Sequence, residues 1–70
     1  MAAKRKFTII IQEDPEGSYT GRCMELRGAI SEGRTIEELK RNMTEAIELV
    51  LESLEEDARK YKKIIIELPN

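Results

Sequence analysis

The sequence predicts a two-layer α+β domain, with three antiparallel strands covered on one face by a long helix and a fourth strand after the helix. Three observations support this prediction. Short stretches rich in β-branched residues alternate with turn residues, a Pro/Gly turn joins the first two stretches, and apolar residues then recur at spacings of three and four. The element order is β-β-β-α-β, and a chain of 70 residues fits a single domain covering residues 1–70.

The first three strands follow one another closely. Residues 7–12 contain three consecutive isoleucines, which is typical of a strand. Residues 14–17 place Asp, Pro and Gly at the first, second and fourth positions that a type I turn prefers. Residues 18–24 are the predicted returning strand of a hairpin. Residues 29–32, closed by Gly33, are the predicted third strand.

A helix is predicted for residues 36–61. Thr35 and Glu38 have the spacing of a capping box, in which the threonine hydroxyl and the glutamate satisfy unpaired amides at the helix start. One helix face is apolar and is formed by Ile36, Leu39, Met43, Ala46, Ile47, Val50, Leu54 and Ala58. Residues 63–68 then predict a last strand, expected to lie beside the first strand and parallel to it.

The predicted helix is longer than the predicted sheet. It would measure about 38 Å, whereas the strands reach only about 20–23 Å. The helix should therefore overhang the sheet, and the overhang carries Leu51, Leu54 and Ala58. A core of this size contributes little net stability and Cys23 is the only cysteine, so no disulfide within the chain can reinforce it. We therefore expect a homo-oligomer, a dimer or larger, with these three residues at the contact.

The sheet face away from the helix is a second expected interface. If the odd positions of residues 7–11 face the helix, then Ile10 points to the opposite face. Ile65 does the same if its neighbours in the last strand point inward, and Met24 can join them. Tyr19 is either an aromatic at the edge of the core or an anchor for a partner.

Composition excludes several classes of function. The chain has no histidine and one cysteine, so we expect no metal site and no cofactor. Cys23 is expected to be a small hydrophobe, buried or half-buried. The net charge is −2, which gives no global attraction to nucleic acid or membranes. Without a signal peptide or a long apolar run, and with a lone thiol, a cytoplasmic location is expected.

Two segments resemble the HicB-like antitoxin family. Residues 19–38, YTGRCMELRGAISEGRTIEE, are similar to the family's aromatic strand, its Pro-Glu-Leu-Pro-Gly-Cys turn, and the glycine, threonine cap and paired acids that follow. Residues 42–47, NMTEAI, are similar to its Asn-x-x-Glu-Ala-Ile helix motif. The chain departs from the family at Met24 and Arg27, where the family has prolines, and at Ala29, where it has cysteine.

The resemblance implies a fold similar to a truncated ribonuclease H domain and a partner of the HicA type, a small basic toxin that cleaves RNA through a histidine. The chain would then neutralise the toxin by masking its active surface. Many members also carry a C-terminal DNA-binding domain; residues 1–70 show no resemblance to one, so we do not expect them to bind an operator.

We expect no enzymatic activity, despite the likeness to ribonuclease H. That chemistry needs a cluster of carboxylates that holds two metal ions, one of them in the middle of the first strand. Residues 7–12 contain no acid, and Glu25, Glu32 and Glu67 lie in different parts of the predicted sheet.

The helix carries an acidic ridge, formed at three- and four-residue steps by Glu45, Glu48, Glu52 and Glu56. The ridge is either a solvated helix face or a docking surface for a basic partner.

Cations precede the first and last strands and would gather at one end if those strands were neighbours; they are Lys4, Arg5, Lys6, Arg59, Lys60, Lys62 and Lys63. The alternatives to an antitoxin are therefore an orphan homo-oligomeric adaptor and a weak nucleic-acid binder that uses this basic end.

Overall fold

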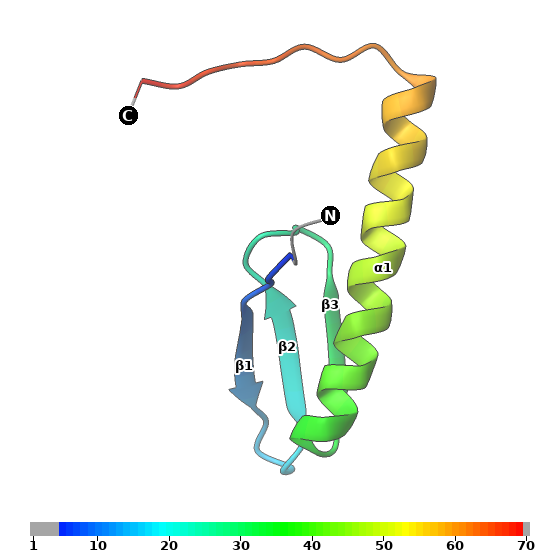
Figure 1. Cartoon of the computed structure of the whole chain (residues 1–70). Helices are drawn as coiled ribbons and strands as arrows, with labels where there is room; N and C mark the ends of the chain where they lie inside the picture. The colour runs from blue at the N-terminus through cyan, green and yellow to red at the C-terminus, as the bar shows by residue number, and fades with distance from the viewer. Residues whose placement is uncertain (1–4, 70) are drawn as a thin grey trace.

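Three antiparallel strands and one helix make up the fold. The computed structural model describes residues 5–69, with β1 (Ile9–Glu13), β2 (Tyr19–Cys23), β3 (Ile30–Gly33) and α1 (Ile36–Lys60) (Figure 1). The strand order in the sheet is β1-β2-β3, and both pairings are antiparallel. The predicted α+β class is confirmed, as are its first four elements to within two residues at each end.

The turn between β1 and β2 forms where the sequence predicts it. The Gly17 amide donates to the Asp14 carbonyl oxygen at 2.9 Å, and Gly17 has φ +91°, a conformation that favours glycine. The Asp14 carboxylate also accepts from the Ser18 hydroxyl at 3.2 Å and the Thr20 hydroxyl at 3.1 Å. These bonds fix the start of β2 relative to the end of β1 and so set the register of the hairpin.

The start of α1 is capped, but the hydrogen bonds differ in one respect from the predicted capping box. The Thr35 hydroxyl accepts from the Glu38 amide at 3.0 Å, as predicted. The Glu38 carboxylate accepts from the amide of Arg34 at 3.0 Å, one residue before the cap. Both contacts satisfy main-chain donors that would otherwise lack partners at the turn between β3 and α1.

The core lies between the sheet and the first half of α1. Its buried residues are Cys23, Leu26, Ala29, Leu39 and Met43. Gly33 allows α1 to approach the sheet, because a Cβ atom at that position would lie 2.6 Å from the Leu39 main-chain nitrogen. The placement of Cys23 confirms the prediction that it is a buried or half-buried hydrophobe.

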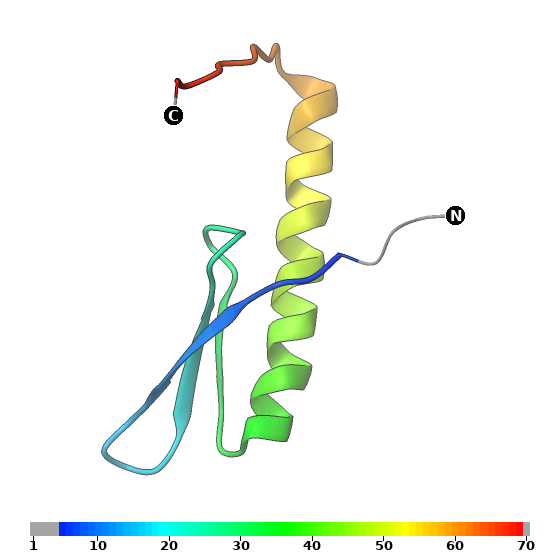
Figure 2. The same ribbon diagram turned by 60° about the vertical axis from the view of Figure 1, so that its left-hand side comes forward.

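The second half of α1 extends past the sheet, as the lengths predict (Figures 1 and 2). Residues 52–60 are all exposed, whereas Leu39 and Met43 near the helix start are buried. Within the described residues no helix has both the length and the apolar character needed to cross a membrane.

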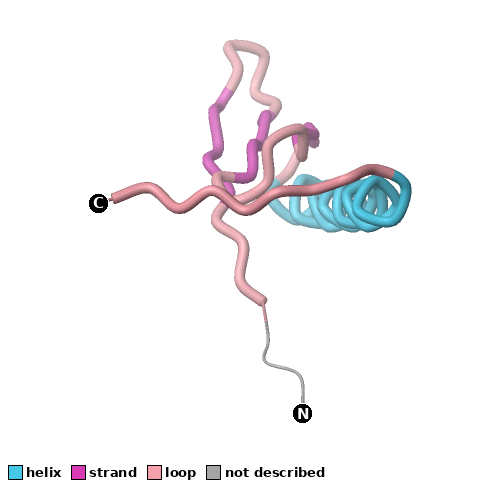
Figure 3. The backbone as a smooth tube through the Cα atoms, turned by 90° about the horizontal axis from the view of Figure 1, so that it is seen from above, coloured by secondary structure: helices cyan, strands magenta, loops and turns pink. Residues whose placement is uncertain are grey.

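The predicted fourth strand is wrong for the single chain. Residues 62–69 are extended but belong to no strand, and they run from the end of α1 back above the sheet (Figures 1 and 3). The helix of 25 residues rises about 37 Å, whereas a strand of five residues spans about 17 Å. The chain therefore leaves α1 about 20 Å beyond the sheet, and residues 62–69 cross above the sheet without pairing with it.

Candidate protein-binding surfaces

One face of the sheet is open to solvent. In the register of the sheet Ile10 lies opposite Arg22, and Arg22 lies opposite Ile30, so the three residues form one row across it. Their neighbours Cys23 and Gly21 face the helix and are buried, which places this row on the other face. Ile10 is 44% exposed and Ile30 is 56% exposed.

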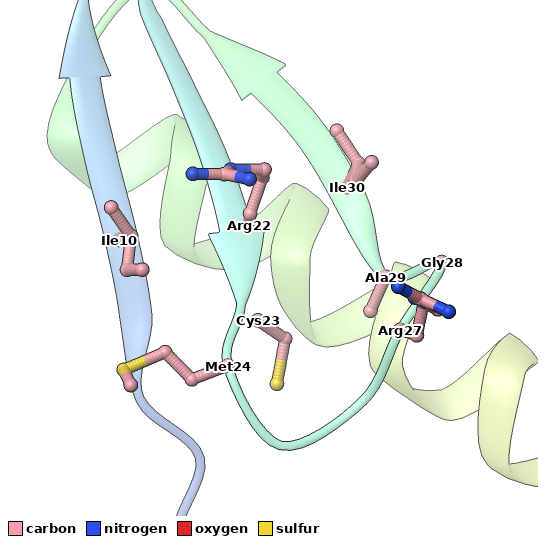
Figure 4. A pocket seen from close by; sticks show the side chains of 8 residues that line it. All are labelled: Ile10, Arg22, Cys23, Met24, Arg27, Gly28, Ala29 and Ile30. Atoms are coloured by element: carbon pink, nitrogen blue, oxygen red, sulfur yellow. The ribbon is translucent and has the colours of Figure 1, made fainter.

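A shallow hollow lies at the end of this open face, toward the loop between β2 and β3. Figure 4 shows Ile10, Met24 and Ile30 around it, with the guanidinium groups of Arg22 and Arg27 at its rim. The hollow has a volume of about 390 Å³. Apolar side chains flanked by arginines suit an acidic or amphipathic protein surface more than a small polar ligand.

The structure brings together only part of the predicted site on this face. Ile10 and Met24 lie on it as expected, but Ile65 is 91% exposed on the extended segment and does not join them in this chain. Tyr19 is half-buried on the helix side, packed against the core, so it occupies the core edge and not the open face.

Arg22 and Ile30 of the open face were not among the residues predicted from the sequence. Both follow from the alternation of side chains along β2 and β3 once Ile10 is assigned to the open face and the hairpin register is known. The pairing register of β1, β2 and β3 was needed to assign these two residues to the open face, and the sequence does not give it.

The acidic ridge is exposed along its whole length. Its members Glu45, Glu48, Glu52 and Glu56 all lie on the solvent side of α1. Glu48 and Glu52 have no basic residue three or four positions away on the helix. The middle of the ridge thus presents negative charge that the neighbouring turns of α1 do not neutralise, whereas Glu45 and Glu56 have Arg41 and Lys60 four positions away.

The overhang of α1 has a mixed character. Leu51 is half-buried and packs against the core, whereas Leu54 is 52% exposed and Ala58 is exposed. Of the three residues predicted to form a contact between copies, Leu54 and Ala58 are therefore accessible to a partner.

The loop that follows β2 holds a charged corner. The main-chain amide of Thr8 donates to the Glu25 carboxylate at 2.6 Å, and the Cys23 thiol lies 3.5 Å from the same oxygen. The hydrogen bond from the Thr8 amide lowers the pKa of Glu25, because it stabilises the charged form. Glu25 therefore has a structural partner in Thr8, the residue that precedes β1.

The predicted basic end does not form in the described chain. It required the last strand to lie beside the first, and residues 62–69 do not do so. Arg5 instead lies over the Phe7 ring, with its guanidinium carbon 5.3 Å from the ring centroid. Lys4, another member of the predicted cluster, lies outside the described residues. In the described part of the chain, no group of three or more Cys, Asp or Glu side chains is placed to hold a metal ion.

Comparison with known proteins places the chain among small proteins of bacteria and archaea. A UPF0150 protein of Synechocystis is 42% identical over 74% of this chain and 75% of its own length. A UPF0150 protein of Thermotoga maritima is 33% identical over 93% of this chain and 88% of its own length. A UPF0150 protein of Archaeoglobus fulgidus is 38% identical over 67% of this chain and 68% of its own. No family model matches the sequence. No solved structure matches it either.

Proposed function

Since this chain belongs to the UPF0150 family, we propose that it acts as a HicB-like antitoxin domain, which binds and masks a small basic RNA-cleaving toxin of the HicA type. The proposal combines this membership with the resemblance of residues 19–38 and 42–47 to HicB-like proteins. The protein would act by binding and not by catalysis, in the cytoplasm where such a toxin would meet RNA.

The observation that carries the proposal is the exposed acidic ridge of α1. Like charges at three- and four-residue steps oppose helix stability by a few tenths of a kcal/mol per pair. A basic toxin would relieve this repulsion and would be attracted to the ridge during encounter. An RNA-cleaving enzyme carries positive charge where it holds phosphates, so an acidic ridge competes with RNA for the same surface.

The open sheet face is left out of the proposed toxin contact, because it points away from α1 and carries Arg22 and Arg27, which would repel a basic partner. Ile10, Met24 and Ile30 on that face remain available to a different, acidic or amphipathic partner surface. Tyr19 and Ile65, which the sequence also suggested as partner contacts, are likewise left out of the proposed toxin contact.

The test is co-expression with a small basic protein encoded beside this chain and containing one essential histidine. We expect the chain to restore growth and to co-purify with the toxin. The triple variant Glu45→Gln, Glu48→Gln, Glu52→Gln should weaken binding at least tenfold at low salt, and added salt should reduce the difference.

A matched control separates the ridge from net charge. The triple variant Glu16→Gln, Glu32→Gln, Glu37→Gln also changes the formal net charge from −2 to +1, using exposed acids outside the ridge. It should bind like the parent chain. Equal loss in both triple variants would contradict a role for the ridge. Failure of the parent chain to co-purify or restore growth would leave the orphan adaptor as the better description.

A further inference from the structure

We propose that residues 62–68 form a β-strand that pairs, antiparallel, with the free edge of β1 in a second copy of this chain, the two copies exchanging these strands reciprocally. The arrangement is a strand-swapped dimer. It does not depend on the proposed antitoxin function, and it uses the edge of the sheet and not the acidic ridge.

The edge of β1 offers unused main-chain groups. β1 is the outer strand of the sheet, paired only with β2. The Thr8 carbonyl oxygen accepts from the Met24 amide at 2.9 Å, so Thr8 turns its main-chain groups toward β2. Because these directions alternate in an antiparallel pair, Ile10 also faces β2, and Ile9 and Ile11 present their N–H and C=O groups to the outside. An exposed edge of this kind is a template for another strand.

Residues 62–68 have the composition of a strand and nothing to pair with in their own chain. Ile64, Ile65 and Ile66 are 83%, 91% and 73% exposed, which is far above the exposure of any core residue. Three consecutive β-branched residues favour an extended conformation. Such a segment gains most by adding to a sheet edge, where its backbone and its side chains are satisfied together.

The chain's own β1 edge is out of reach as a site for this strand. Two residues separate β3 from α1, and α1 rises about 37 Å, so it finishes about 20 Å beyond the far end of the sheet. Seven extended residues span about 23 Å. Nearly all of that length is used to return to the sheet, and little remains to pair with β1. A second copy, free to approach the segment, removes this limit.

One register satisfies both the apolar and the charged side chains. With Ile65 opposite Ile10, an antiparallel strand places Ile64 opposite Ile11 and Ile66 opposite Ile9. The same alignment places Lys62 opposite Glu13, an attractive pair.

The parallel arrangement aligns the same isoleucines but brings like charges together. Lys62 and Lys63 would then lie toward Lys6, and Glu67 would lie beside Gln12 and next to Glu13. The charges at the two ends therefore favour the antiparallel direction.

The added strand would also cover an apolar groove. Phe7 and Ile9 of the β1 side and Met43 and Ile47 of α1 line a groove of about 240 Å³ on the helix side of the sheet. In the proposed register, Ile64 and Ile66 share a face with Ile11 and Ile9 and so point to this side. Ile65 points to the other side, beside Ile10, and extends the open face across the dimer.

The first test is the mass of the full chain in solution. The chain has a mass of 8.1 kDa, and sedimentation equilibrium at micromolar concentration should give twice this value. Ile11→Pro removes an outward-facing N–H that the β1–β2 pairing does not use, so the variant should remain folded and become monomeric. Ile11→Thr keeps the N–H and should remain dimeric.

A second variant tests the other partner of the contact. Ile64→Pro with Ile66→Pro removes two N–H groups from the added strand at residues that contribute nothing to the core of the chain, so it cannot act by unfolding it. It should be monomeric, and the matched pair Ile64→Val with Ile66→Val should be dimeric. A monomeric parent chain, or a dimer in both proline variants, would overturn the proposal.

Cysteine pairs test the direction. Gln12→Cys with Lys63→Cys places two thiols opposite each other in the antiparallel arrangement, and mild oxidation should give a covalent dimer. Gln12→Cys with Glu67→Cys is opposite only in the parallel arrangement and should not cross-link; cross-linking of this pair alone would overturn the antiparallel pairing. The single variant Gln12→Cys controls for dimers formed through Cys23.

Discussion

The side-chain amide of Asn42 donates a hydrogen bond to the main-chain carbonyl oxygen of Glu32 at 2.7 Å. This bond joins the second turn of α1 to β3, the strand that precedes it. It gives a physical role to the first residue of the Asn-x-x-Glu-Ala-Ile motif, because the asparagine holds the angle at which the helix leaves the sheet. The position of the acidic ridge relative to the sheet depends on that angle.

Replacing Asn42 should therefore weaken the fold. Asn42→Ala removes one hydrogen bond and should lower the free energy of unfolding by about 1 kcal/mol, measured by urea denaturation. Asn42→Asp keeps the shape but turns the donor into an acceptor that faces the Glu32 carbonyl, so we expect a larger loss. If Asn42→Asp were as stable as the parent, the bond would have no structural importance.

Gly33→Ala should destabilise the protein through a steric clash. The new Cβ would lie 2.6 Å from the Leu39 nitrogen and 3.0 Å from its Cα, and main-chain atoms cannot move aside without displacing α1. We expect a loss of about 2–3 kcal/mol in thermal or urea unfolding. At Gly17 a Cβ would meet no atom within 4 Å, so Gly17→Ala should cost only the strain of φ +91°, about 1 kcal/mol. Equal losses at both positions would contradict the close approach of α1.

Substitution by alanine should lower the stability of the fold far more at one apolar residue of α1 than at another. Met43 is 2% exposed and Leu54 is 52% exposed. Met43→Ala should cost about 3 kcal/mol by opening a cavity, enough to unfold much of so small a domain. Leu54→Ala should change the stability of the monomer by less than about 0.5 kcal/mol.

Leu54→Ala also has a separate readout. If the overhang forms a contact between copies, this variant should raise the dissociation constant of the oligomer without altering the fold. An unchanged dissociation constant would remove Leu54 from the oligomer contact.

Acid should weaken the protein partly through Glu25. The pKa of Glu25 is lowered in the folded chain by the Thr8 amide, so the charged form is favoured by folding. This contribution is fully present above the ordinary glutamate pKa of about 4.3 and is lost as the pH falls through the lowered folded value. Glu25→Gln should make the urea midpoint less sensitive to pH below about 4.3. Glu16→Gln, which removes a charge in the exposed turn, should retain the sensitivity of the parent at Glu25; equal flattening in both variants would refute this assignment.

The local elements could be predicted because their causes are local. The turn at residues 14–17 depends on adjacent residues, and the cap at Thr35 depends on a residue three positions away. The length of α1 followed from the apolar spacing, and its overhang from simple geometry.

The predictions that failed depended on contacts between segments that lie far apart in the sequence. The propensity of residues 63–68 for a strand was apparent, but whether a strand forms depends on reaching a free edge, and the rise of α1 prevents that in the single chain. For the same reason Ile65 does not lie beside Ile10 within one chain. Tyr19 could not be assigned to core or interface because a single aromatic at a strand end has no periodic neighbours to settle its face.

The contacts within the fold have a consequence for how it forms. Each pair of packed elements is adjacent along the chain or separated by one element: β1 with β2, β2 with β3, and α1 with β3 and β2. Such low contact order is typical of domains that fold within milliseconds or faster. We expect the monomer to be complete in that time, whereas a contact between copies must wait for a collision whose rate rises with concentration. Newly made chains should therefore be folded well before they are paired, and the balance between the two states should follow the abundance of the protein in the cell.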